Sequence, residues 1–282
     1  MLFRSWLPRM CAFDNGMCIT GLTYLYNKTG EKKYLDAAER MADWLLTVMR
    51  RDDGSYFSKF NVADGKPENP GGKWSLISGS YLSKLAIGFT ALHKATNDSN
   101  YEEAVRMLCA WSLTKQQSDG RFLTDEDESK TFVHPHCYSA EGLLVSGLAF
   151  KEPAWIDAAR KAVEWIAPQQ LSSGGFPAYY EDGKFLEIES PDISAQVLRL
   201  WLLLPDKAGT SVDIDGVVRN IASFQFSSQK REEAGGIASG PAWFHGEENR
   251  AGQHINSWVT MFCAQTLGLT LDEGRMEPLL LV

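Results

Sequence analysis

Residues 14–46 read DNGMCITGLTYLYNKTGEKKYLDAAERMADWLL. The first half is rich in small and apolar residues and ends at Gly30, a residue type that commonly terminates helices. In the second half, Tyr34, Ala38 and Leu45 follow the roughly 3.6-residue spacing of a helix, while the charged side chains fall mainly on the other face. The stretch therefore predicts a buried helix followed directly by a helix with one solvent-facing side, and the two form an αα-hairpin.

The same two helix types alternate along the rest of the chain. Further helices that are apolar nearly all round, as expected of helices packed between neighbours, are predicted at 80–98, 138–150, 192–204 and 254–269. Further helices with one wet face are predicted at 101–113, 154–169 and 213–225. Together with the pair at 14–46, the alternation predicts a stack of αα-hairpins with five inner and at least four outer helices.

Short turns that contain glycine follow the outer helices. They recur at intervals of roughly 55–65 residues, which is typical of a repeat architecture. Segments with the two-residue alternation of a strand are short and lie near these turns. The glycines are Gly54, Gly120, Gly174 with Gly175, and Gly235 with Gly236.

Composition and charge exclude several classes of protein. The chain has 282 residues, a formal net charge of −8 and no basic block, which argues against a nucleic-acid partner. Its five cysteines are scattered without a CxxC pair, which argues against a disulfide framework and a thiolate zinc site. No apolar run approaches the ~18 residues of a membrane span. Because Arg4, Pro8 and Arg9 interrupt the first apolar residues, the N-terminus is a poor signal peptide, and we expect a cytoplasmic protein.

The alternation resembles that of the α/α-toroid proteins, in which inner helices form a ring and outer helices wrap it. The group includes six-hairpin glycosidases, such as unsaturated glucuronyl hydrolases, and the N-acylglucosamine 2-epimerases. Residues 14–46 look most similar to the carbohydrate-active members, because an inner helix that begins with Asp14 is followed by a Gly-Glu-x-x-Tyr-Leu-x-x-Ala pattern ending at Ala38. The resemblance covers almost the whole chain and implies an all-α, α/α-toroid fold in one domain, residues 1–282.

A six-hairpin ring needs more helices than the sequence shows. We therefore expect an incomplete ring, or one that is closed by a missing N-terminal segment or by another copy of the chain. The segment HPHCY, residues 134–138, also looks similar to prenyltransferase β subunits. The upstream Asp and Cys of their zinc site have no counterpart here.

Polar and aromatic residues stand at the start of each predicted inner helix. If the inner helices run parallel in one ring, these starts meet in one pocket. Helix N-termini would add positive dipole ends that favour an anionic group of a substrate. The candidate residues are Asp14; Trp74 and Tyr81; His134, His136, Tyr138 and Glu141; Asp192, Gln196 and Arg199; and His254, Asn256 and Trp258.

The segment SPDISAQVLRLW, residues 190–201, carries a polar stripe along a buried helix. Asp192, Gln196 and Arg199 are spaced i, i+4 and i+7, so they share one face. Buried polar groups are costly unless they are paired or functional. The stripe is either a helix cap with a buried Asp–Arg contact, or a catalytic carboxylate positioned by Gln196 and Arg199 beside a sugar.

The segment VHPHCYSAEGLL, residues 133–144, has the same form. His134, Tyr138 and Glu141 share a face if the helix starts early, whereas Pro135 favours a start near His136. Glu141 is then a general acid or base, with His134 or His136 binding substrate, or it is a structural carboxylate. No metal site is expected, because adjacent residues of a helix point apart.

The remaining candidates have two interpretations each. Asp14 is a helix cap or a catalytic carboxylate, and His254 is a substrate ligand, a base or a histidine that is bonded at a helix start. The aromatic side chains stack on sugar rings or belong to the core; they are Trp74, Tyr81 and Trp258.

Three functions fit these residues, and none of them needs a cofactor. The first is glycoside hydrolysis of an oligosaccharide, including one that contains uronic acid, by two of the carboxylates of Asp14, Glu141 and Asp192. The second is sugar epimerisation or isomerisation, or a uronyl epimerase or lyase reaction, with proton transfer by His136 and His254. The third is glycan binding without catalysis.

Overall fold

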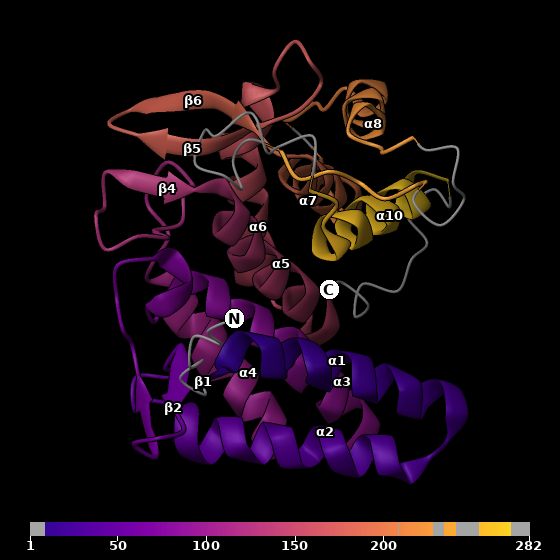
Figure 1. Cartoon of the computed structure of the whole chain (residues 1–282). Helices are drawn as coiled ribbons and strands as arrows, with labels where there is room; N and C mark the ends of the chain where they lie inside the picture. The colour runs from indigo at the N-terminus through magenta and orange to yellow at the C-terminus, as the bar shows by residue number, and fades with distance from the viewer. Residues whose placement is uncertain (1–8, 208, 228–233, 241–253, 272–282) are drawn as a thin grey trace, which may run out of the picture.

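A computed structural model describes residues 9–207, 209–227, 234–240 and 254–271 (Figure 1). Helices of the two predicted types alternate along it, so five inner and four outer helices are confirmed in these ranges. The inner helices are α1 (Ala12–Thr29), α3 (Leu85–Thr96), α5 (Val133–Phe150), α7 (Pro191–Leu203) and α10 (Ser257–Leu271). The outer helices are α2 (Lys32–Trp44), α4 (Ser99–Leu113), α6 (Pro153–Ile166) and α8 (Ile214–Ser223).

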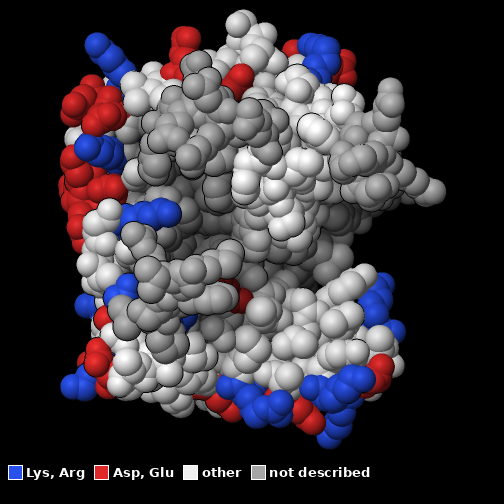
Figure 2. Space-filling view, in the orientation of Figure 1, with Lys and Arg blue, Asp and Glu red and all other residues white. Residues whose placement is uncertain are grey.

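Each inner helix contacts the inner helix that follows it, and α1, α3, α5 and α7 also contact the next outer helix along the chain. Helices α1 to α4 form one half of the molecule, and α7, α8 and α10 lie in the other half (Figure 1). Lysine, arginine and acidic side chains cover the surface over α2, as expected of an outer helix (Figure 2). That residues 1–282 form one domain, and what closes the ring between α1 and α10, stay predictions.

Glycines let the inner helices approach one another closely. A Cβ atom at Gly142 of α5 would lie 2.3 Å from the carbonyl oxygen of Ser83, in a 3₁₀ turn that leads into α3. A Cβ atom at Gly88 of α3 would lie 3.0 Å from the carbonyl oxygen of Gly16 in α1. The small residues that characterise the inner helices in the sequence therefore set the spacing of the ring.

The repeated glycine turns have a common structural role. Gly54, Gly120 and Gly174 have φ angles of 85°, 97° and 88°, a region that glycine adopts without strain. Each turn lies against the backbone of the next outer helix: a Cβ atom would approach the carbonyl oxygens of Met107, Lys161 and Gly216 to 2.9, 2.3 and 2.1 Å. The turn therefore fixes the spacing between one outer helix and the next.

Short strands lie at one end of the helices. The sequence predicted short strand segments near the glycine turns but not the two sheets that they form. One sheet has the order β1 (Arg9–Cys11), β2 (Lys59–Asn61) and β3 (Lys66–Glu68), and the other has the order β4 (Lys130–Phe132), β5 (Pro177–Glu181) and β6 (Lys184–Glu189). The hairpin of β5 and β6 was missed. Its turn is Asp182-Gly183, both with positive φ, and Asp-Gly is a strong hairpin signal.

Helix α5 starts earlier than Pro135 suggested. It begins at Val133, so the expected start near His136 is wrong. The physical reason is that the first turn of a helix has no partner for its N–H groups, so a proline in this turn costs no hydrogen bond. The early start places His134, Tyr138 and Glu141 on successive turns of one helix.

None of the helices in the described ranges has the length and apolar character needed to cross a membrane. A cytoplasmic location stays a prediction.

Candidate active site

A pocket of about 500 Å³ lies at the end of the ring where the inner helices begin. The loop at 72–75 and the strand β5 complete its wall. In Figure 2 the surface is hollowed between the half that carries α1 and the half that carries α10. Pockets of this size bind small ligands and single sugar units. Of the predicted site residues, those that line it are Asp14, Trp74, Tyr81, His134, Tyr138, Asp192 and Trp258.

Two of these residues pair across helices. Nδ1 of His134, in the first turn of α5, lies 3.0 Å from Oδ2 of Asp192, in the first turn of α7. The Asp192 side chain is only 1 % exposed and also accepts a hydrogen bond from the Ser190 hydroxyl. The positive end of the α7 dipole favours its negative charge. An oriented carboxylate with an imidazole beside it can accept and pass on a proton.

Asp14 brings a second carboxylate to the pocket from α1. It is the third residue of that helix and is exposed, whereas the N-cap position belongs to Cys11, so Asp14 is not the cap. Lys59 of β2 donates to Cys11 Sγ at 2.8 Å beside it. Burial raises the pKa of the Cys11 thiol, and Asp14 raises it further. A carboxylate, a cation and a thiol thus meet at one side of the pocket.

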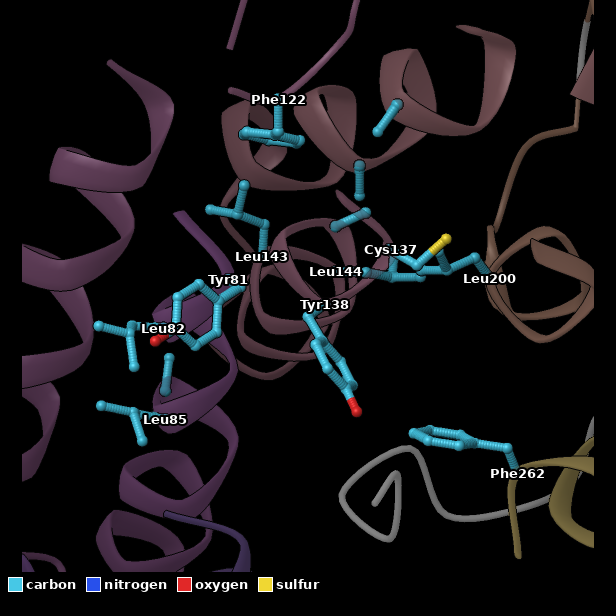
Figure 3. Packing of buried hydrophobic residues seen from close by; sticks show 14 of the residues in the cluster. Tyr81, Leu82, Leu85, Phe122, Cys137, Tyr138, Leu143, Leu144, Leu200 and Phe262 are labelled. Atoms are coloured by element: carbon cyan, nitrogen blue, oxygen red, sulfur yellow. The ribbon is translucent and has the colours of Figure 1, made fainter. Parts of the chain in front are cut away.

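An aromatic wall forms the third part of the site. The indole Nε1 of Trp258 donates to the hydroxyl of Tyr138 at 2.9 Å. The Phe13 ring lies 4.8 Å from the ring of Tyr138, between centroids, and 6.4 Å from that of Trp258, so this wall combines side chains of α1, α5 and α10. Figure 3 shows Tyr138 pointing from α5 towards Phe262 of α10. Aromatic side chains with a few polar groups are typical of ligand pockets.

Glu141 lies beneath the pocket and does not line it. Its side chain is completely buried, with Oε2 2.6 Å from Lys84 Nζ and Oε1 3.0 Å from Arg199 Nε. Burial raises the pKa of the Glu141 carboxyl, but Arg199 and Lys84 outweigh burial and hold it below its ordinary value. Its geometry matches the structural alternative for this residue, that of a buried carboxylate paired with two basic side chains.

Arg199 and Gln196 are buried in α7 below Asp192 and do not line the pocket. Both residues make contacts between helices: Asp192 lies beside His134, and Arg199 binds Glu141 and Gln265. The Asp192–Arg199 contact expected within the helix stays a prediction.

His136 lies in the buried core. It is buried among Phe122, Trp165 and α6: its Nδ1 accepts from the Phe122 N–H at 3.1 Å, and its Nε2 lies 3.1 Å from the Ala162 carbonyl oxygen. Burial lowers its pKa to about 4. It faces away from the pocket lining, so substrate binding by His136 does not fit this position.

His254 and Asn256 precede α10 outside the pocket lining. Nδ1 of His254 lies 3.4 Å from the Ser239 hydroxyl. The side-chain oxygen of Asn256 accepts from the Trp258 N–H at 2.9 Å and so caps α10.

Sequence reasoning missed several lining residues because they stand on strands and loops rather than on helix stripes. Cys11 and Phe13 come shortly before Asp14 in the chain, which is the one signal that pointed to them. The others come from the short strands and the long connections; they include Ser58, Lys59, Lys73, Asp125, Phe132 and Tyr179.

Comparison with known protein families gives a match for this chain. The model described as glycosyl hydrolase family 76 matches residues 10–168, more than half of the sequence. The chain belongs to glycosyl hydrolase family 76. Membership confirms the predicted resemblance to six-hairpin glycosidases.

One curated relative of this family 76 chain is mannosyl-oligosaccharide 1,2-alpha-mannosidase MNS1 of Arabidopsis thaliana. It is 25% identical over 118 residues, which is 37% of this chain and 21% of the relative. The match therefore spans only about a fifth of that protein.

Solved structures share the architecture. D-mannose isomerase superposes with a TM-score of 0.72 at 13% identity, over 96% of this chain and 73% of the other. Unsaturated glucuronyl hydrolase from Bacillus sp. GL1 gives 0.69 at 12% identity, over 93% and 74%. The GH76 alpha-mannanase of Bacteroides thetaiotaomicron gives 0.54 at 20% identity, over 66% and 50%. At such identities the likeness shows the fold alone, and it confirms the predicted α/α toroid.

Proposed function

We propose that this protein is a glycoside hydrolase that cleaves an α-mannoside linkage in the pocket, with Asp14 and Asp192 as its catalytic carboxylates. The observation that carries the proposal is that these two carboxylates come from α1 and α7 to one aromatic-lined pocket. Glycoside hydrolysis needs a pair of carboxylates beside the scissile bond. Membership of family 76 supports the reaction class, and the mannosidase and mannanase relatives support the sugar.

The surroundings of the two carboxylates favour different roles. Asp192 accepts a hydrogen bond from the Ser190 hydroxyl and lies beside His134 at the positive end of the α7 dipole, which suits the group that activates water or attacks the anomeric carbon. Asp14 is the other carboxylate that lines the pocket, and it is left with the role of the acid that gives its proton to the departing glycosidic oxygen. Water supplies the hydroxyl and the proton that the two products gain.

The aromatic wall has a separate task in this proposal. Trp258 is partly exposed and is held by its hydrogen bond to the buried Tyr138, and a sugar ring has an apolar face that packs on such a flat aromatic surface. This wall positions the ring while the carboxylates act on its linkage.

The test is proton NMR of α-linked manno-oligosaccharides incubated with the protein in D₂O, beside neutral and uronic-acid oligosaccharides. New reducing-end anomeric signals are expected from the mannosides. Asp14→Asn and Asp192→Asn should each lower the rate by about 10²–10⁴-fold. Asp36→Asn, at an exposed position of α2, is the matched control and should leave the rate unchanged. Full activity in either pocket variant would refute the assignment.

A sugar isomerase or epimerase is the second candidate, supported by the likeness in fold to D-mannose isomerase over 96% of this chain. The histidine pair expected for it does not meet, because His136 is buried outside the pocket, so His134 would be the proton carrier. Exchange of a ring proton for deuterium without cleavage would identify this reaction. Binding without either change would identify a glycan-binding protein.

A further inference from the structure

A second, smaller hollow of about 270 Å³ lies on the outer face of the sheet β4-β5-β6. It adjoins the pocket, because Phe132 and Tyr179 line both. These two residues are register partners on β4 and β5, and their rings meet edge to face at 5.3 Å between centroids. The wall between the pocket and the sheet face is therefore a pair of aromatic side chains.

The alternation of the strands gives this sheet two different faces. Tyr180 and Phe185 turn inward and pack on Trp165 of α6, with centroids 5.4 and 4.7 Å away. On the other face, Tyr179 lies opposite Leu186 of β6, which is 37 % exposed, and Ile188 continues the row. A contiguous apolar row that faces outward marks a binding surface more often than an isolated exposed side chain does.

Charged groups border this apolar row. Nζ of Lys130 lies 3.1 Å from a carboxylate oxygen of Glu181 at the outer end of the same hollow, and both side chains are more than 40 % exposed. Figure 2 shows basic and acidic side chains gathered on the side of the molecule where Figure 1 places β4 to β6. The face thus offers an apolar surface with a hydrogen-bond donor and an acceptor at its edge.

We propose that the outer face of the sheet β4-β5-β6 is a further sugar-binding subsite, and that the natural substrate is an oligosaccharide or polysaccharide that runs from the pocket over Phe132 and Tyr179 onto Leu186. The inference rests on the proposed function. A saccharide is the occupant that the face fits, because the row begins in the pocket and because sugars have both an apolar ring face and hydroxyl groups. Apolar contact with the row adds affinity for each sugar unit that reaches it.

The experiment measures binding of α-linked manno-oligosaccharides, from disaccharide to hexasaccharide, by calorimetry in an Asp192→Asn background, so that no turnover interferes. Affinity should rise with length until the sheet face is occupied. Leu186→Asp adds a charge to the apolar row and should weaken hexasaccharide binding about tenfold, with a much smaller effect on the disaccharide. Leu186→Ala should weaken hexasaccharide binding by about threefold. Leu25→Asp, at a similarly exposed position of α1, should change neither affinity.

The outcomes separate the subsite from the function. One outcome is that the parent and the Leu186→Asp variant each bind the disaccharide and the hexasaccharide with the same affinity. The pocket then binds sugar but the sheet face does not, so the subsite is refuted and the proposed function is not. An equal loss for both lengths also refutes it, because the change would then act through the pocket. If Leu186→Asp instead converts a dimer to a monomer without changing sugar affinity, the face is an interface between copies. If no mannoside binds at any length, the proposed function fails and the subsite with it.

Discussion

Glu141 and Lys84 form an ion pair of 2.6 Å in which neither side chain has any exposed surface. Arg199 binds the same carboxylate and also donates a 2.6 Å hydrogen bond to the side-chain oxygen of Gln265. These four residues stand on, or directly before, the inner helices α3, α5, α7 and α10. The network ties four of the five inner helices together under the floor of the pocket, where Lys84 also lies 4.7 Å from the centroid of the Tyr138 ring.

Replacing Glu141 by glutamine should lower the stability of the folded protein, and any loss of activity should come with that loss of stability. The change leaves Lys84 and Arg199 buried without a counter-charge, and breaking a buried pair in this way costs about 3 kcal/mol or more. Chemical denaturation should therefore show a lower free energy of unfolding for Glu141→Gln.

The control for this prediction is Glu102→Gln. Glu102 pairs with Arg106 on the surface of α4, where the loss should stay below about 1 kcal/mol. A Glu141→Gln protein of unchanged stability that had lost hydrolysis would return Glu141 to the catalytic residues.

Sequence spacing identified the face on which the polar residues lie but not their depth. His134 and Glu141 share a face of α5, and Asp192 and Arg199 share a face of α7. Seven residues of helix rise about 10 Å, so the first residue of each pair reaches the pocket and the second lies in the buried floor. The pairs then meet across the helices, at the top as His134–Asp192 and below as Glu141–Arg199. Periodicity within one helix cannot show contacts between helices.

The fold was more predictable, because its signals are local and repeat. The helix types and the glycine turns each recur along the chain, and the turns at Gly54, Gly120 and Gly174 all lie against the backbone of the next outer helix. What the sequence did not show was the hairpin of β5 and β6 and the pocket residues on strands. These segments are short, and their place depends on long-range pairing, such as that of Phe132 with Tyr179.

His134→Gln should reduce turnover while leaving the fold intact. Its imidazole lies 3.0 Å from the Asp192 carboxylate at the pocket and is itself partly exposed, so the change removes a proton carrier without opening the core. We expect kcat to fall about 10²-fold with a smaller change in KM. Steady-state kinetics on a manno-oligosaccharide measure this, with His93→Gln on α3 as the matched control. A change confined to KM would mean that His134 binds sugar and moves no proton.

His136 should make the protein sensitive to acid. Burial lowers its pKa to about 4 in the folded protein, whereas an exposed histidine has a pKa near 6.5. Between these pH values the unfolded chain binds a proton that the folded chain does not, so the free energy of unfolding falls as pH decreases from about 6.5 to about 4. The slope from this one group approaches about 1.4 kcal/mol per pH unit.

The test is the free energy of unfolding of the parent and of His136→Gln, measured at several pH values across this range. The variant lacks the titrating group, so its free energy of unfolding should depend less steeply on pH. This holds whatever stability the variant loses at pH 7 from the bonds to Phe122 and Ala162. Parallel curves would contradict the assignment of this acid sensitivity to His136.

Gly120→Ala should destabilise the protein because the new side chain clashes with the next repeat. Gly65→Ala is the control, because it introduces the same kind of backbone strain without a clash. Both glycines have positive φ, 97° and 64°, and alanine in that region costs about 1 kcal/mol. At Gly120 the new methyl group would also lie 2.3 Å from the carbonyl oxygen of Lys161, whereas at Gly65 nothing lies within 4 Å. We expect a loss of about 3 kcal/mol or more at Gly120 and about 1 kcal/mol at Gly65. Denaturant titration of both variants measures the difference, and equal losses would mean that the contact of this turn with α6 does not hold the outer helices at their spacing.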